Sequence, residues 1–284
     1  MEIGIFCAFS EITPPDQMAR AARAIEERGF HAIWVPEHVV LFDDYESRYP
    51  YSEDGKLPGF RGGIMEPWTA LAFMAAHTRR VRLGSGVCLI PQRNPVYTAK
   101  QIADVDHLSG GRVNVGIGLG WLREEYDALN APWPQRAKRA RDYIAVMKTL
   151  WMDDVSEFRG EFYTLPPCVQ NPKPVQSPHP PLFFGGEGDP ALTRVADLGQ
   201  GWMGAGLTPE QMPERLARLD DLLADRGRNR SDVKIYNLPN RTATREMLDG
   251  YAEVGVEHVI QMVPLRDMDR AMARLDALAD LAFK

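Results

Sequence analysis

Short apolar runs alternate with amphipathic stretches along the whole of this chain, and this alternation restricts its fold more than any other feature. The strand-like runs cover residues 2–9, 31–35, 81–89, 112–117, 182–184, 201–203, 233–238 and 256–262. The helical patterns cover residues 14–28, 66–78, 95–108, 136–152, 190–198, 209–226, 244–254 and 266–282. Repeated βα units predict parallel strands joined by helices. Eight units in 284 residues, without a linker between halves, predict one α/β domain over 1–284, a (β/α)8 TIM barrel, with an open doubly wound sheet as the alternative.

Composition and charge argue against several classes of function. The net charge is −6 and the 33 Lys and Arg residues form no basic block, so we expect no nucleic-acid partner. No apolar run is long enough to span a bilayer and no signal sequence opens the chain, so we expect a cytoplasmic protein with no membrane partner. Its three cysteines lie far apart, which predicts free thiols, and its six histidines show no metal-ligand spacing, so we expect no metal site.

Two connections are longer than ordinary βα loops. They are the insertions after the second strand, 36–65, and between the fourth helix and the fifth strand, 153–181. Long loops in compact domains are often lids or binding loops. Within the second insertion, residues 157–163 predict a small two-stranded hairpin around Gly160.

Two glycine-rich segments follow predicted strands. Residues 109–127 run from a strand into Gly116, Gly118 and Gly120, which would let bare backbone approach a flat or anionic ligand. Residues 185–188 precede a helix whose first turn contains Pro190, and a helix amino terminus with glycine around it favours an anion such as phosphate. A tight βα turn without a ligand is the alternative. In a barrel both segments open on the face formed by the carboxyl ends of the strands.

Charged side chains at the same strand ends are candidates for chemistry. His38 can hydrogen-bond or protonate a ligand, or be structural. Glu37 can be an acid, an orienting partner of His38 or a surface charge. Arg93 can hold a phosphate or carboxylate, with an ordinary exposed arginine as the alternative. Glu124 and Glu125 lie beyond the glycines of the fourth strand, and the simplest interpretation is that they charge the start of a helical turn.

Three blocks of sequence resemble the luciferase-like monooxygenase superfamily, and within it the branch that uses the deazaflavin coenzyme F420. They are residues 82–151, which include LGSGVCLIPQRNPVYTAKQIADVDHLSGGRVNVGIGLGWLREEY, then PLFFGG with ALTRVADLGQGWM, and WVPEHVV near the amino end. The resemblance implies a (β/α)8 barrel with the cofactor ring at the carboxyl-terminal mouth. It also implies a non-prolyl cis peptide at Gly86-Val87, in a bulge that supports the ring.

The resemblance assigns roles to the candidates. His38 and Glu37 match a histidine and an acidic residue near the reactive ring, so His38 is the leading catalytic residue. Trp121 stands where some relatives have a carboxylate, which leaves Glu124 as a substitute proton donor. The residues expected to bind the cofactor are Gly86, Val87, Arg93, Gly118, Gly120, Trp121 and, around its phosphate, Gly185, Gly186, Glu187 and Gly188.

The expected activity is hydride transfer between F420 and a small-molecule substrate. An FMN-dependent monooxygenase and a non-catalytic flavin-binding relative are the alternatives. The resemblance also implies a homodimer. The loop at 42–63 is expected to form a lid over the ring; its aromatic and basic residues are Tyr45, Arg48, Tyr49, Tyr51 and Arg61, and packing of the tyrosines on a dimer partner is the other interpretation.

Overall fold

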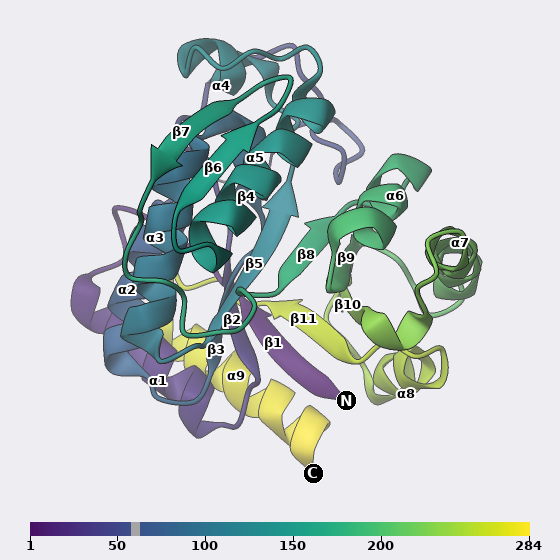
Figure 1. Ribbon diagram of the computed structural model, residues 1–284. Helices are drawn as coiled ribbons and strands as arrows, with labels where there is room; N and C mark the ends of the chain where they lie inside the picture. Colours follow the sequence, from purple (N-terminus) through teal and green to yellow (C-terminus); the bar gives the residue numbers. More distant parts are fainter. Residues whose placement is uncertain (58–62) are drawn as a thin grey trace.

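The strands pair around a closed circuit, which confirms the predicted (β/α)8 barrel (Figure 1). The computed structural model describes residues 1–57 and 63–284. The order of strands in the sheet is β3-β2-β1-β11-β10-β9-β8-β5-β4, and β3 also pairs with β5, which closes the cylinder. The strands are β1 (Glu2–Phe6), β2 (Ala32–Val35), β3 (Arg82–Ser85), β4 (Cys88–Leu89), β5 (Val113–Gly118), β8 (Leu182–Gly185), β9 (Gly201–Ala205), β10 (Lys234–Leu238) and β11 (His258–Met262). All neighbours in this sheet are parallel, so every carboxyl end opens on one face.

The predicted third strand is divided into β3 and β4 by a bulge. The peptide bond between Gly86 and Val87 is cis, as the family resemblance implies. Gly84 pairs with Asn114, but Cys88 pairs with Ile117, so the register against β5 slips by one residue across this bond. The two short strands therefore fill a single position in the barrel wall, next to β5.

Helices surround the barrel, and most begin where the sequence predicts. They are α1 (Pro15–Glu27), α2 (Pro67–His77), α3 (Pro95–Ser109), α5 (Arg136–Met152), α6 (Asp189–Leu198), α7 (Met212–Ala224), α8 (Arg245–Glu253) and α9 (Met268–Phe283). Asn94, Thr244 and Asp267 cap α3, α8 and α9 by accepting hydrogen bonds from backbone amides of the first turn. A further short helix, α4 (Arg123–Ala128), was not among the eight predicted helices and lies just after β5.

Aromatic side chains fill the interior of the barrel. The ring of Trp34 meets those of Phe183 and Tyr236 edge-on, with 5.9 Å between ring centroids in both pairs. A Cβ at Gly84 would lie 2.2 Å from the Trp34 ring, so the neighbouring strand needs glycine there to admit the indole. The interior is a packed core, and a ligand must bind at its mouth.

The second insertion forms the predicted hairpin. Strands β6 (Ser156–Arg159) and β7 (Thr164–Cys168) are antiparallel, and Figure 1 shows them over α5 on the outside of the barrel. The amide of Phe162 donates to Asp142 of α5 at 2.7 Å, which anchors the turn. All three cysteines are free. Within the described residues no helix has the length and apolarity that a membrane crossing requires.

Candidate active site

The predicted glycine segments meet around one side chain, Val87. A Cβ at Gly118 would lie 2.3 Å from Cγ2 of Val87, and one at Gly185 would lie 3.3 Å from Cγ1. The bulge after β3 and the ends of β5 and β8 are therefore in direct contact at the mouth of the barrel. Gly118 is needed here to make room for Val87, which is a packing reason for glycine that sequence reasoning did not find. Whether bare backbone also contacts a cofactor stays a prediction.

His38 is held by a carboxylate that the sequence did not assign to it. Nδ1 of His38 lies 2.9 Å from Oε2 of Glu125, and the exposed fractions of the two side chains are 8% and 0%. The other oxygen of Glu125 accepts hydrogen bonds from the amides of Val39, at 2.6 Å, and Val40, at 3.3 Å. Glu125 thus fixes both the imidazole of His38 and the backbone that follows it.

Glu125 belongs to the buried face of α4, and a signal for this exists in the sequence. Leu122, Glu125, Tyr126 and Leu129 recur at helical spacing, and the first three are buried. A carboxylate on such a stripe requires a buried partner. The sequence interpretation gave Glu125 no role beyond the charging of a helical turn, but the structure gives it His38 as a partner.

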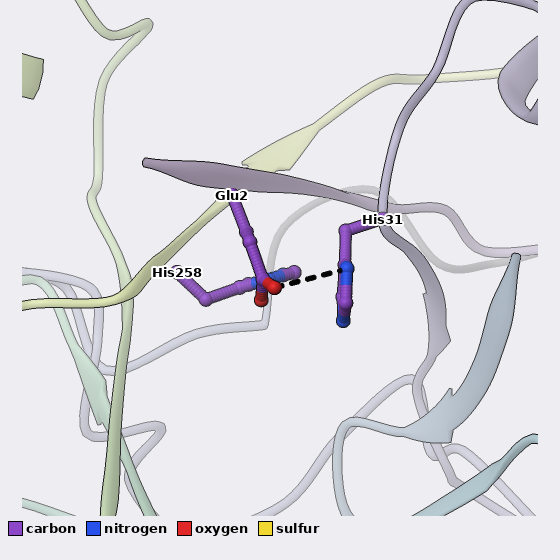
Figure 2. A group of neighbouring side chains, drawn as sticks. All are labelled: Glu2, His31 and His258. Atoms are coloured by element: carbon purple, nitrogen blue, oxygen red, sulfur yellow. Dashed lines mark ion pairs between the residues drawn. The ribbon is translucent and has the colours of Figure 1, made fainter.

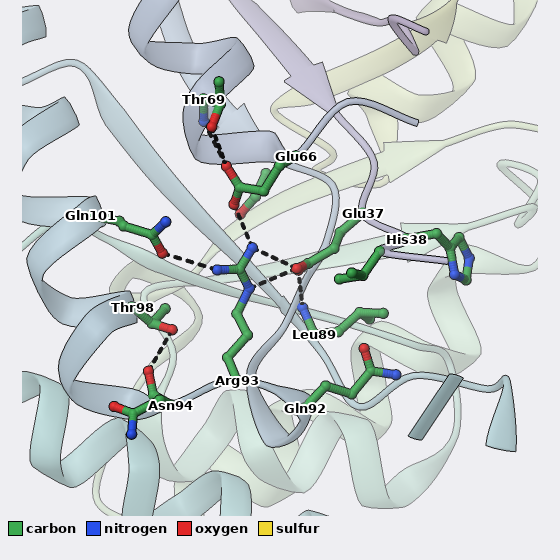
Figure 3. Close-up of polar contacts among 12 residues, drawn as sticks. Glu37, His38, Glu66, Thr69, Leu89, Gln92, Arg93, Asn94, Thr98 and Gln101 are labelled. Atoms are coloured by element: carbon green, nitrogen blue, oxygen red, sulfur yellow. Dashed lines mark hydrogen bonds and ion pairs between the residues drawn. The ribbon is translucent and has the colours of Figure 1, made fainter. Parts of the chain in front are cut away.

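Glu37 points away from His38 and pairs with Arg93 (Figure 3). Oε1 of Glu37 accepts from Nε of Arg93 at 2.6 Å, and Oε2 accepts from the amide of Leu89 at 2.6 Å. The same guanidinium donates to Glu66 at 2.5 Å and to Gln101 at 3.1 Å. The suggestion that Glu37 orients His38 is therefore corrected, because Glu125 does so. Arg93 is not an exposed arginine, and its donors face protein acceptors that join the β4 region to α2 and α3.

Glu124 anchors the first insertion. Its Oε1 accepts from the amides of Glu46, at 2.7 Å, and Ser47, at 3.1 Å. Burial opposes ionisation of this carboxyl, but the hydrogen bonds from the Ser47 hydroxyl and from these amides outweigh it and lower the pKa of Glu124 to about 2. A lowered pKa favours the ionised form and so opposes the role of proton donor expected for Glu124, and that role stays a prediction.

The Trp121 ring packs against aromatic residues of the first insertion at the mouth of the barrel. Its ring centroid lies 5.6 Å from that of Tyr45, 5.2 Å from that of Tyr49 and 5.8 Å from that of His38. Arg123, two residues after Trp121, donates from its amide to the Ser47 hydroxyl at 3.0 Å. These contacts place the insertion against the loop after β5, and its role as a lid over the ring stays a prediction. Arg48 donates to the carbonyl of Glu53 within the insertion, and the predicted lid residue Arg61 lies outside the described residues.

The loop after β8 leads into the amino terminus of α6, as predicted. Gly188 is the residue before the helix, and the nearest atom to a Cβ there would be 3.7 Å away, in Pro190. Gly186 has a φ of +107°, which favours glycine, and its carbonyl accepts from the Trp202 indole at 2.8 Å. Gly120, in the loop after β5, has a φ of +74°.

Glu187 joins this loop to the first insertion. Its Oε1 accepts from the amide of Ala205, at the end of β9, at 2.8 Å, and Tyr51 is hydrogen-bonded to the carboxyl group. Burial raises the pKa of Glu187, and the hydrogen bonds only partly offset this. The loop that was predicted to hold a phosphate therefore carries a carboxyl group with a raised pKa.

Known proteins resemble this chain in sequence and in fold. A family model described as luciferase-like monooxygenase matches residues 1–239. An uncharacterised protein of Mycobacterium tuberculosis is 34% identical over 97% of this chain and 95% of its own length. An FMNH(2)-dependent dimethylsulfone monooxygenase of Pseudomonas putida is 32% identical over 50% of this chain and 39% of its own length. The solved structure of an F420-dependent secondary alcohol dehydrogenase in complex with an F420-acetone adduct has a TM-score of 0.76 at 16% identity, over 99% of this chain and 97% of that one.

Proposed function

Because the chain belongs to the luciferase-like monooxygenase family, we propose that it is an oxidoreductase that transfers hydride between coenzyme F420 and a small organic substrate. The observation that carries this proposal is the placement of His38 at the barrel mouth, with Nδ1 bound to the buried carboxylate of Glu125. The fold shared with an F420-dependent alcohol dehydrogenase supports the choice of coenzyme.

The mouth has the features that a planar ring with a phosphorylated arm requires. The bulge at Gly86-Val87 and the glycines of β5 and β8 adjoin one another, and Gly188 immediately precedes α6, where a Cβ would meet Pro190 at 3.7 Å. Unpaired amides and the positive end of the helix dipole favour an anion there. Bound F420 would supply the hydride chemistry, while the protein supplies position and electrostatics.

His38 would act through Nε2. An ionised carboxylate only accepts hydrogen bonds, so Glu125 keeps the proton of the neutral imidazole on Nδ1. Nε2 then carries a lone pair, and no hydrogen bond among the described residues engages it. It can accept a proton from the reacting group of a substrate that is being oxidised, and return one when the substrate is reduced. In this mechanism Glu125, Glu37 and Arg93 are positioning residues.

The second candidate is an FMN-dependent monooxygenase. It is favoured by the sequence similarity to the FMNH(2)-dependent enzyme of Pseudomonas putida, which covers half of this chain. The same mouth would hold FMN through its ring and phosphate, so the two candidates differ in the cofactor that binds and in the use of oxygen.

The two cofactors can be compared directly on the purified protein. Affinities for F420 and FMN are measured by quenching of cofactor fluorescence. Turnover is followed by cofactor absorbance with a panel of small hydroxyl and carbonyl compounds, starting from the oxidised and from the reduced form of each cofactor, with and without oxygen. We expect tighter binding of F420 and oxygen-independent turnover. Preference for FMN with oxygen consumption would support the second candidate, and binding without turnover would support a non-catalytic relative.

The variant His38→Ala tests the assigned residue. We expect it to bind the cofactor with nearly unchanged affinity and to lose turnover by about 100-fold or more. His107→Ala is the matched control, because His107 is an exposed histidine of α3. Unchanged turnover in His38→Ala would exclude the role of this imidazole.

A further inference from the structure

Three metal-binding side chains meet at the end of the barrel opposite the candidate active site. Glu2 begins β1, His258 begins β11, and these two residues are direct partners in the pairing of the strands. His31 immediately precedes β2, and its amide donates to the carbonyl of Ile3 at 2.8 Å. The amino ends of the first, second and last strands thus bring together one carboxylate and two imidazoles, as Figure 2 shows.

The three side chains converge on one point. Nδ1 of His31 lies 3.3 Å from Oε1 of Glu2, and Nδ1 of His258 lies 3.5 Å from Oε2. One ligand atom from each residue falls within 4.8 Å of the other two. The two imidazole rings meet edge-on, with 5.3 Å between their centroids.

His258 has a buried nitrogen with one long contact. Its side chain is fully buried, and Nδ1 makes no hydrogen bond of good geometry within the described residues; the Glu2 carboxylate faces it at 3.5 Å. The ring is stacked on Tyr236, with centroids 4.4 Å apart, and Nε2 accepts from the Trp34 indole at 3.4 Å. These contacts hold the ring with Nδ1 facing Glu2. A buried nitrogen whose one partner lies at 3.5 Å is weakly satisfied, and such atoms often mark a missing ligand.

We propose that Glu2, His31 and His258 bind a divalent transition-metal ion such as Zn²⁺. Two imidazole nitrogens and one carboxylate oxygen form a common ligand set for zinc, with a water molecule in the fourth position. Ligand atoms about 2.0 Å from a tetrahedral ion lie about 3.3 Å from one another. The two ligand atoms that are farthest apart in this cluster must therefore move closer by about an ångström or more when the ion binds. His31 and Glu2 are partly exposed, which gives the ion a route from solvent.

Binding changes the proton arrangement at His258. Coordination through Nδ1 places the imidazole proton on Nε2. A protonated Nε2 cannot accept a hydrogen bond, so metal binding breaks the long hydrogen bond from the Trp34 indole. Two cationic side chains, Arg82 and Lys234, lie near enough to act on His31 and oppose a cation. Lys234 is paired with Glu257 at 3.1 Å, and Arg82 donates to Asn114 and Gln176, both at 2.8 Å, so neither competes directly for the ligand atoms.

The ion would join the first strand of the barrel to the last. Because this end of a (β/α)8 barrel contributes to stability rather than to chemistry, we assign the site a structural role. An ion that binds only the folded state raises the melting temperature in proportion to the logarithm of its concentration above the dissociation constant.

The site is tested by titration of tag-free protein, after treatment with a chelator, with Co²⁺ and Zn²⁺ near neutral pH. We expect one Co²⁺ per chain with visible absorption typical of a low-coordinate ion, displacement by Zn²⁺ in calorimetry, and a raised melting temperature. In Glu2→Gln and His31→Asn we expect affinity to fall by at least about 100-fold and the thermal shift to disappear. His107→Asn, at an exposed histidine outside the cluster, should bind as the native chain does.

Both test positions are partly exposed, and circular dichroism will show whether each variant is folded. Absence of stoichiometric binding to the native chain would overturn the proposal. So would native affinity in both folded variants, because the ion would then lie elsewhere.

Discussion

Nδ1 of His38 lies 2.9 Å from Oε2 of Glu125, and the two residues come from different elements: one follows β2 and the other belongs to α4 after β5. The carboxylate is fully buried and also accepts a hydrogen bond from the Gln92 side chain at 3.2 Å. A buried carboxylate with this number of donors is held in one position. It therefore sets both the orientation and the tautomer of the imidazole.

Replacement of Glu125 by glutamine should impair catalysis without removing His38. The amide oxygen can still accept from the backbone of Val39, but its NH2 group would donate to Nδ1 of His38 and move the imidazole proton to Nε2. We expect turnover to fall by about 100-fold or more, with little change in cofactor affinity. Nitrogen NMR of labelled histidine reports the tautomer. Native turnover together with a changed tautomer would contradict the assigned role of Nε2.

Glu124→Gln is the matched variant one residue earlier, and it should be nearly neutral for catalysis. Its carboxylate holds the amides of Glu46 and Ser47, and the glutamine oxygen can continue to accept these bonds. We expect turnover within about threefold of the native value, since a carboxylate with a lowered pKa supplies no proton at neutral pH. A loss comparable to that of Glu125→Gln would restore Glu124 as a proton donor.

Arg93 is expected to contribute to stability more than to ligand affinity. Arg93→Ala leaves the carboxylate of Glu37, whose side chain is 1% exposed, buried without its cation. Loss of one member of a buried ion pair typically costs about 3–5 kcal/mol. Urea unfolding should show a loss of this order, and the double variant Arg93→Ala/Glu37→Gln should recover part of it. If stability is unchanged and only cofactor affinity falls, the guanidinium contacts the ligand instead.

The sequence predicts the barrel well, because its signals are local. The alternation of strands and helices and the hairpin around Gly160 are each visible within a few residues, and parallel pairing then places His38, Trp121 and Glu187 on one face. The strand limits are less well predicted. The first was expected to extend to Phe9 but ends at Phe6, because pairing with its neighbours ends there.

The partners of charged residues are not predictable in this way. Glu37 is adjacent to His38 in sequence, but successive side chains on an extended segment point in opposite directions. The Glu37 side chain therefore points away from His38 and contacts Arg93. Glu125 reaches His38 only because α4 folds back over the end of β2. Likewise, Glu2 and His258 become neighbours only when the barrel closes, and neither has a metal-ligand motif around it.

Gly118→Ala should destabilise the barrel through the bulge. A Cβ would lie 2.3 Å from Cγ2 of Val87, so either the Val87 side chain or the end of β5 must shift. Such overpacking typically costs about 1–3 kcal/mol in unfolding free energy. The double variant Gly118→Ala/Val87→Ala removes the clashing methyl groups and should regain part of the loss, which a double-mutant cycle by urea unfolding measures. Independent effects of the two substitutions would mean that the contact is not limiting.

Glu187 should make cofactor affinity depend on pH. Burial raises its pKa, so the carboxyl is neutral to a higher pH than usual and becomes negative as the pH rises further. A negative charge in the loop at 185–188 opposes a phosphate at the start of α6, so affinity should fall as the carboxyl ionises.

Glu187→Gln keeps the acceptor for the Ala205 amide but cannot ionise. The dissociation constants of the native chain and the variant should agree at low pH and diverge by up to about tenfold above the pKa of Glu187. The ratio of the two dissociation constants is unaffected by titration of the cofactor itself, since both proteins bind the same ionic form of the cofactor. A ratio that stays constant from about pH 4 to 8 would place the phosphate away from this loop.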